Sequence, residues 1–211
     1  TYMPLVRLAA RAKVDQASRE LSDKIITGKG ISFSSEADKQ DFKQYLQYMI
    51  SEMLNNAVDH AGSSIDVIAC AQYYPLKQLT QVAIVDCGIG FKATLAPKYP
   101  EISSEELAVS KAIEKGVTGA LKYSYGSTTK NIGYGLYVLN NMLEKINGRL
   151  VIISKDGMLS RKGSQLETKT LETGWSGSIV AFQIQEKNIT YDFPVFMNML
   201  NMEEEDGEDI F

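Results

Sequence analysis

An apolar stretch of the chain, residues 79–85, ends abruptly at Asp86 and two closely spaced glycines. The stretch, LTQVAIV, is long enough for one buried strand. Gly88 and Gly90 follow it, and glycine permits a sharp turn and a close approach of backbone to a flat ligand. The sequence therefore predicts a buried strand that ends at a binding site, with the aspartate as a hydrogen-bond acceptor for an exocyclic amine. The alternative is an ordinary Asp-Gly turn.

Helix and strand patterns alternate on both sides of this strand. Ser34 or Ser35, with Asp38 following, is typical of a helix start. The acidic run from Glu203 is expected to be solvated or disordered. The segment between the last two strands is expected to be a polar hairpin or loop. We expect an α/β protein in two layers, a mixed β-sheet covered on one face by helices. Helical periodicity covers residues 5–26, 36–60, 103–115 and 135–147, and strand patterns cover 65–74, 79–85, 150–154 and 178–185.

Composition excludes several functional classes. The chain has 211 residues and a net charge of -4, so direct nucleic-acid binding through phosphate neutralisation is not expected. It has no apolar run of membrane-spanning length and no recognisable secretory signal at its start. Cys70 and Cys87 lie outside any CxxC pattern, which indicates a reduced, cytoplasmic protein. His60 is the only histidine, so zinc hydrolases and histidine-rich metal sites are excluded.

Polar residues on the predicted helix 36–60 form a first candidate site. Glu52 and Asn56 are four residues apart and share one side of the helix, and His60 lies near its apolar arc. An amide oxygen beside a carboxylate can hold Mg²⁺ and orient a water molecule. The alternative, in which Asn56 and His60 are core polar groups bonded to backbone, stays open on these residues alone.

A glycine-rich segment before the predicted helix 135–147 forms another candidate site. Backbone N–H groups at a helix start bind phosphate, helped by the helix dipole. Lys130 and the hydroxyls of Thr128 and Thr129 are placed to assist. Taken alone, such a segment is more often a flexible loop than a phosphate site.

The order and spacing of these clusters resemble one known family. ExxxNAxxH at Glu52–His60 precedes DxGxG at Asp86–Gly90 and GxGL at Gly133–Leu136. The pattern resembles the ATP-binding domain of gyrase-type topoisomerases, sensor histidine kinases, mismatch-repair and chaperone ATPases and anti-sigma-factor kinases, the GHKL or Bergerat fold. GWSGSIVAF, at residues 174–182, is similar to the closing strand of that domain, with Ser178 in the place of a threonine. The resemblance spans residues 40–186.

The resemblance implies roles for individual residues and an ATP and Mg²⁺ requirement. It makes Asn56 the Mg²⁺ ligand, Asp86 the reader of the adenine amino group, and Glu52 the general base of hydrolytic members. Residues 116–135 become a flexible ATP lid, expected to be poorly ordered without nucleotide. The remaining implied nucleotide contacts are His60, Gly88, Gly90, Thr128, Thr129, Lys130, Gly133, Gly135, Leu136 and Ser178.

The resemblance also divides the chain. Residues 1–35 would be an N-terminal helical extension, 36–190 the histidine-kinase-like ATP-binding domain, and 191–211 a C-terminal extension with an acidic tail. Other nucleotide folds fit less well. A GxGxxA pattern at residues 88–93 suggests a Rossmann dinucleotide site, but the segment runs into Pro97 and no second strand carries the acidic residue. GxxxxGK[ST], the P-loop pattern, does not occur.

The reaction class stays open among members of the family. His60 lies within the implied nucleotide site, so autophosphorylation in the usual histidine-kinase manner is not expected. Few residues follow the last matched strand, so the transducer domain of gyrase-type enzymes is not expected either. Three alternatives remain: slow ATP hydrolysis, transfer of the γ-phosphate to Ser or Thr of a partner protein, and non-catalytic ATP sensing within an assembly. A homodimer is also compatible with the sequence.

Overall fold

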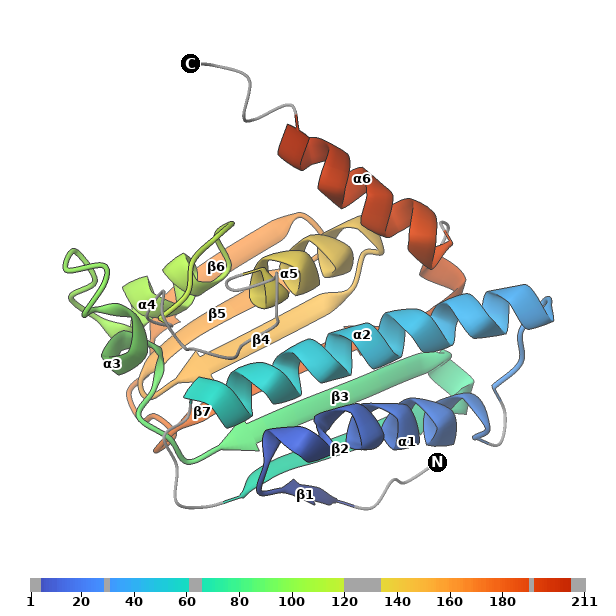
Figure 1. Cartoon of the computed structure of the whole chain (residues 1–211), viewed down its shortest axis with the longest axis horizontal. Helices are drawn as coiled ribbons and strands as arrows, with labels where there is room; N and C mark the ends of the chain where they lie inside the picture. Colours follow the sequence, from blue (N-terminus) through green and yellow to red (C-terminus); the bar gives the residue numbers. More distant parts are fainter. Residues whose placement is uncertain (1–4, 29–30, 61–65, 120–133, 190–191, 206–211) are drawn as a thin grey trace.

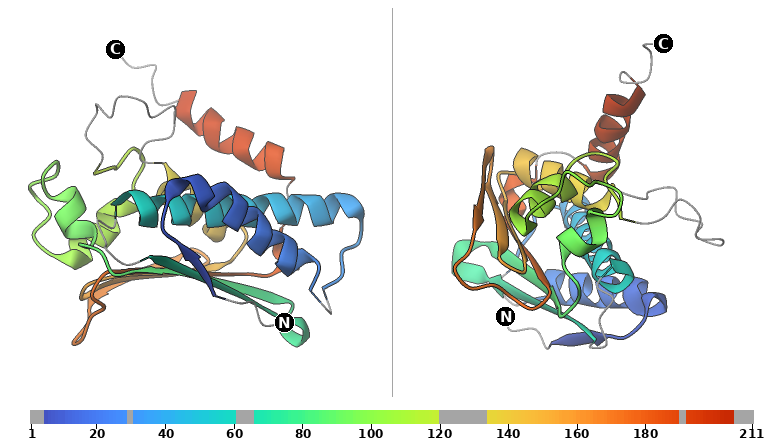
Figure 2. Two further views of the ribbon diagram at one scale, coloured as in Figure 1. Left: turned by 60° about the horizontal axis from the view of Figure 1, so that its bottom comes forward. Right: turned by 90° about the vertical axis from the view of Figure 1, so that its left-hand side faces the viewer.

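The computed structural model describes residues 5–28, 31–60, 66–119, 134–189 and 192–205. Within these ranges the chain forms one seven-stranded sheet, ordered β1-β2-β3-β7-β4-β5-β6, with the helices on one of its faces (Figure 1, Figure 2). This arrangement confirms the predicted α/β sandwich. The strands are β1 (Val6–Leu8), β2 (Val67–Tyr74), β3 (Leu79–Asp86), β4 (Arg149–Ser154), β5 (Gly157–Lys162), β6 (Gln165–Thr170) and β7 (Ser178–Ile184). The helices are α1 (Val14–Ile26), α2 (Glu36–His60), α3 (Phe91–Leu95), α4 (Glu105–Ala112), α5 (Gly135–Lys145) and α6 (Phe193–Glu205), with short 3-10 turns η1 (Arg11–Lys13), η2 (Pro75–Lys77) and η3 (Glu186–Asn188).

Strand direction differs from the prediction. Every pairing among the described strands is antiparallel, so the expectation of a mixed sheet is wrong. The physical reason is the place of β7. β3 and β4 run parallel to each other, as strands joined through helices commonly do. β7 returns between them and pairs antiparallel with both.

The long helix α2 begins and ends where the sequence predicts. The Ser35 hydroxyl accepts a hydrogen bond of 3.0 Å from the Asp38 N–H, which caps the first turn. The predicted apolar arc of α2 is buried against the sheet, and burial of each large apolar side chain contributes roughly 1.5–3 kcal/mol. Its members are Phe42, Leu46, Met49, Met53 and Ala57. This face fixes the rotation of α2 and therefore the direction of its polar residues.

The N-terminal segment corrects the predicted helix over residues 5–26. Only α1, from Val14 onward, is α-helical. Residues 6–8 instead form β1, which pairs with β2 and buries Leu8 to 2% exposure. The apolar residues near position 6 fit either a helix or a strand, and the free edge of β2 selects the strand.

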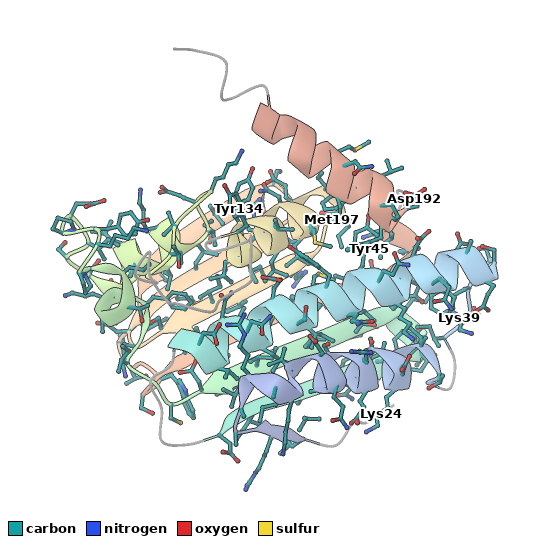
Figure 3. All side chains as sticks on the ribbon, in the orientation of Figure 1. Lys24, Lys39, Tyr45, Tyr134, Asp192 and Met197 are labelled. Carbon is teal, nitrogen blue, oxygen red and sulfur yellow. The ribbon has the colours of Figure 1, made fainter. Side chains whose placement is uncertain are left out.

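The C-terminal helix α6 was not predicted. Phe193 packs edge-on against Tyr45 of α2 with 5.2 Å between ring centroids, and Phe196 lies 5.6 Å from the same ring. Figure 3 shows Tyr45, Asp192 and Met197 gathered where α6 meets α2. The helix continues to Glu205, so the first residues of the acidic run are helical rather than disordered. The packing of these aromatic rings stabilises the helix, whereas the acidic residues at its end had suggested a disordered segment.

Candidate functional site

Glu52 and Asn56 lie where α2 passes the first turn of α5. A β-carbon added to Gly135, the first residue of α5, would lie 2.4 Å from Glu52 Oε2 and 3.3 Å from Asn56 Nδ2. Only a residue without a side chain allows so close an approach. The structure therefore brings together three residues that the sequence placed in two separate motifs. Leu136 beside them is buried in the core, which anchors the start of α5.

The start of α5 suits an anionic group. The residue before it, Tyr134, makes no side-chain hydrogen bond that caps the helix. Amide N–H groups in the first turn of a helix have no partner within the helix, and the helix dipole adds partial positive charge there. Phosphate oxygens are suitable acceptors for such groups.

Burial alters the acidity of Glu52. Desolvation raises the pKa of its carboxyl group, and the positive charge of Arg11 acts in the opposite direction. Arg11 comes from η1 and forms an ion pair with Asp59 of α2. Sequence reasoning missed Arg11, because nothing in the sequence indicates that residue 11 meets the C-terminal end of α2. A carboxylate with a raised pKa is a better proton acceptor than an ordinary glutamate.

Asp86 lies at the end of β3 and is only 4% exposed. Its Oδ1 accepts hydrogen bonds from the N–H of Gly88 at 2.7 Å and of Ser178 at 3.3 Å. Its Oδ2 accepts a hydrogen bond from the Ser178 hydroxyl. Ser178 is the residue directly opposite Asp86 in the pairing of β3 with β7. The sheet register thus brings together an aspartate and a serine that are far apart in the sequence, and it holds the carboxylate in one orientation.

The turn after Asp86 is held by residues that the sequence did not indicate. Gly90 has φ of +88°, in the left-handed region that favours glycine. The Ser154 hydroxyl accepts a hydrogen bond from the Phe91 N–H at 2.8 Å and donates one of 2.6 Å to Glu105. Lys155 donates to the Gly88 carbonyl at 2.8 Å. Glu105 falls within the predicted helix 103–115, but nothing in the sequence indicates that it meets this turn. The other contacts depend on the place of β4 in the sheet.

Several predicted site residues lie outside the described residues. These are Thr128, Thr129, Lys130 and Gly133, together with most of the predicted lid. His60 ends α2, but its side chain is likewise outside the description. Among the residues that are described, no cluster of three or more His, Cys, Asp or Glu is suited to hold a metal. Asn56 places an amide group beside Glu52 at the start of α5.

Comparison with known families identifies the class of protein. The family model for the histidine kinase-, DNA gyrase B-, and HSP90-like ATPase matches residues 43–183, which is more than half of the chain. The chain belongs to this family, and the matched region is a GHKL-type ATP-binding domain. A search of curated proteins finds no match. The antiparallel sheet also excludes the Rossmann alternative, which requires parallel strands. No helix in the described ranges is long and apolar enough to cross a bilayer.

A first prediction concerns the cost of burying Glu52. Burial raises the pKa of Glu52 in the folded protein, so folding favours its protonated form. The stabilisation from this protonated form is fully present below the ordinary pKa of 4.5 and is lost as pH rises through the raised pKa. Glu52→Gln should therefore raise the melting temperature at about pH 7.5, and the gain should vanish near pH 4. A shift of about 2–4 °C per kcal/mol is expected for a chain of this size. Thermal unfolding monitored by circular dichroism at both pH values is the measurement, and a gain independent of pH would contradict the assignment.

A second prediction concerns Gly135. Gly135→Ala places a methyl group 2.4 Å from Glu52 Oε2, so either the carboxylate or the start of α5 must move. We expect at least a tenfold loss of ATP affinity, about 1.4 kcal/mol. Lys145→Ala, at an exposed position in the last turn of α5, is the control for changes to that helix away from the close approach. Isothermal titration calorimetry with ATP measures both variants, and equal affinities would show that the close approach is not needed.

Proposed function

We propose that this domain binds Mg-ATP and promotes attack on the γ-phosphate, with Glu52 as general base. The observation that supports the proposal most directly is the meeting of Glu52, Asn56 and the start of α5. A carboxylate that can accept a proton, an amide that is proposed to ligate the metal through its oxygen, and a helix terminus suited to phosphate then lie at one place. A site that only bound nucleotide would need no carboxylate there.

Adenine recognition is assigned to the other end of the site. The Asp86 carboxylate accepts a hydrogen bond from the adenine amino group. Hydrogen bonds from the Ser178 hydroxyl and the Gly88 N–H hold that carboxylate in place. Gly88 and Gly90 are proposed to let the backbone approach the adenine ring closely, and at Gly90 a side chain would in addition meet Glu105, Ser154 and Lys155. The phosphates reach the N–H groups at Gly135 and Leu136. Gly133, Thr128, Thr129, Lys130 and His60 are proposed as additional phosphate contacts from the sequence motif alone.

The chemistry of Asn56 fits a hard cation. Its amide oxygen is the kind of ligand that Mg²⁺ accepts, and that ion usually completes its coordination with phosphate oxygens and water. Mg²⁺, when bound, neutralises charge on the phosphates. Glu52 would take a proton from a water molecule or from the hydroxyl of a partner protein. If water attacks the γ-phosphate, the result is slow hydrolysis. If the hydroxyl of a partner protein attacks, the result is Ser/Thr phosphotransfer of the anti-sigma-kinase type within a larger assembly.

One experiment separates these outcomes. The protein is incubated with Mg²⁺ and ATP labelled at the γ-phosphate, alone and with proteins co-purified from its source. Free labelled phosphate indicates hydrolysis, and label on another protein indicates phosphotransfer. Bound but unreacted ATP under both conditions would contradict the catalytic proposal and favour an ATP-sensing subunit. Glu36→Ala, which removes a carboxylate from the first turn of α2, serves as the matched control for Glu52→Ala.

A further inference from the structure

The sheet has a second face that the helices do not cover in the described part of the chain (Figure 2). Side chains on this outer face form rows that cross the strands, because residues in register lie side by side. Antiparallel sheets with one solvated face normally carry polar residues on it. On this outer face, by contrast, one whole row of side chains is apolar.

The row nearest the nucleotide end of the sheet is apolar across five consecutive strands. All five side chains are partly exposed. Arg7 and Lys169 flank them at the two edges of the sheet. Five neighbouring apolar side chains facing water are costly, and such patches commonly mark contact surfaces. In strand order, the apolar row consists of Ile68, Val85, Ile179, Ile153 and Met158.

The next row along the strands is made of small residues, and the row after it of long polar ones. Between them the outer face has a hollow of about 630 Å³. The small row consists of Cys70, Ala83, Ala181, Val151 and Ser160, and the polar row of Gln72, Gln81, Gln183, Arg149 and Lys162. The amides of the polar row occupy β2, β3 and β7, and its cations occupy β4 and β5.

We propose that this outer face binds the same face of a second copy, with a two-fold axis along β7. β7 is the central strand of the seven, so the rotation places β3 of one copy over β4 of the other and β2 over β5. Apolar residues then face apolar residues, for example Val85 against Ile153 of the second copy. In the polar row, Gln81 faces Arg149 and Gln72 faces Lys162. Amide oxygens accept hydrogen bonds from these cations, so one surface supplies both halves of the match.

The hollow provides room for this contact. Packed sheets lie about 10 Å apart, too close for two facing rows of extended Arg, Lys and Gln side chains. These side chains lean over the neighbouring small row, where Ala83 and Ala181 leave space. Like charges stay apart, except that Arg7 faces Lys169 at the solvent-exposed margin, where salt screens them.

The size of the face is also sufficient. Six strand spacings of about 4.8 Å and strands of about 20 Å give a projected area close to 600 Å² per copy. Side chains corrugate this surface, so its accessible area approaches the roughly 800 Å² per partner of a stable interface. The proposal does not depend on ATP turnover, and its tests need no nucleotide.

Sedimentation equilibrium at tens of micromolar protein measures the first consequence. We expect the unmodified chain to be a dimer and Ala181→Glu to be a monomer, because the rotation brings the two introduced carboxylates together away from water. Leu107→Glu, at an exposed position on α4, is the control and should remain dimeric. Circular dichroism verifies that both variants fold. A monomeric unmodified chain, or dimers in both variants, would overturn the proposal.

Cross-linking tests the axis itself. In a Cys70→Ser, Cys87→Ser background, Ala181→Cys should be joined efficiently to its counterpart by a short bismaleimide. Met158→Cys is the matched control on the same face. Its counterpart lies four strands away, about 19 Å across the sheet, so it should not be joined. Efficient linkage at Met158 with none at Ala181 would overturn the axis, and linkage at neither position would overturn the face-to-face contact.

Discussion

Glu52→Ala is expected to bind ATP with near-normal affinity and to turn it over about 10²–10⁴-fold more slowly, as removal of a general base typically does. The substitution leaves the proposed adenine acceptor at Asp86 and the amide of Asn56 unchanged. Calorimetry gives the affinity, and release or transfer of labelled γ-phosphate gives the rate. A variant that reacts at the rate of the unmodified chain would make Glu52 a bystander, and the domain would then be an ATP-sensing module.

Asn56→Ala should fail in a different way. Loss of its amide oxygen removes a proposed Mg²⁺ ligand, so both phosphate binding and turnover should fall. Asn55→Ala is the matched control, because Asn55 lies one residue away and about 100° around the same helix. Comparing affinities with and without Mg²⁺ isolates the role of the metal. If Asn56→Ala kept the full effect of Mg²⁺ on affinity, the metal assignment would be wrong.

Asp86→Asn should weaken ATP binding by about 10–100-fold, the range expected for a hydrogen bond to a charged group. The substitution replaces one acceptor oxygen by a donor, which cannot pair with the adenine amine. The same change disturbs the bonds from Ser178 and Gly88, so the unfolding temperature should be measured beside the affinity.

The matched control for this variant is Asp66→Asn, at an exposed position just before β2. It should bind ATP as the unmodified chain does. Ser178→Ala should give a smaller loss than Asp86→Asn, because the Gly88 and Ser178 N–H groups still hold the carboxylate. Unchanged affinity in Asp86→Asn, measured by calorimetry, would reject the adenine assignment.

The sequence alone predicted the elements whose signals are local. α2 was correct from its Ser35 cap to His60, because its apolar residues recur with helical spacing over many turns. β3 was clear from its apolar run and the glycines after it. The motif residues of the candidate site followed from a resemblance, and the family match over residues 43–183 confirms that resemblance. These features depend on residues close together in the chain, so they can be predicted from short segments of the sequence.

Features that depend on long-range contacts were decided by the tertiary structure. The segment around Val6 became a strand because the edge of β2 was free to pair. β7 entered between β3 and β4, which made the sheet antiparallel and placed Ser178 against Asp86. α6 was missed because its stability comes from rings of α2 that are distant in sequence.

Local sequence motifs were enough to predict the groups that we propose to act on ATP, which are Glu52, Asn56, Asp86 and the glycines after it. The tertiary structure decided how those groups are held. The approach of α5 to α2 set Glu52 in a partly dry environment, and the sheet register supplied Ser154 and Lys155 to the turn after Asp86. The same register aligned apolar and polar rows on the outer face. Pairing between strands is a free-energy balance over the whole sheet, and no local window of sequence contains it.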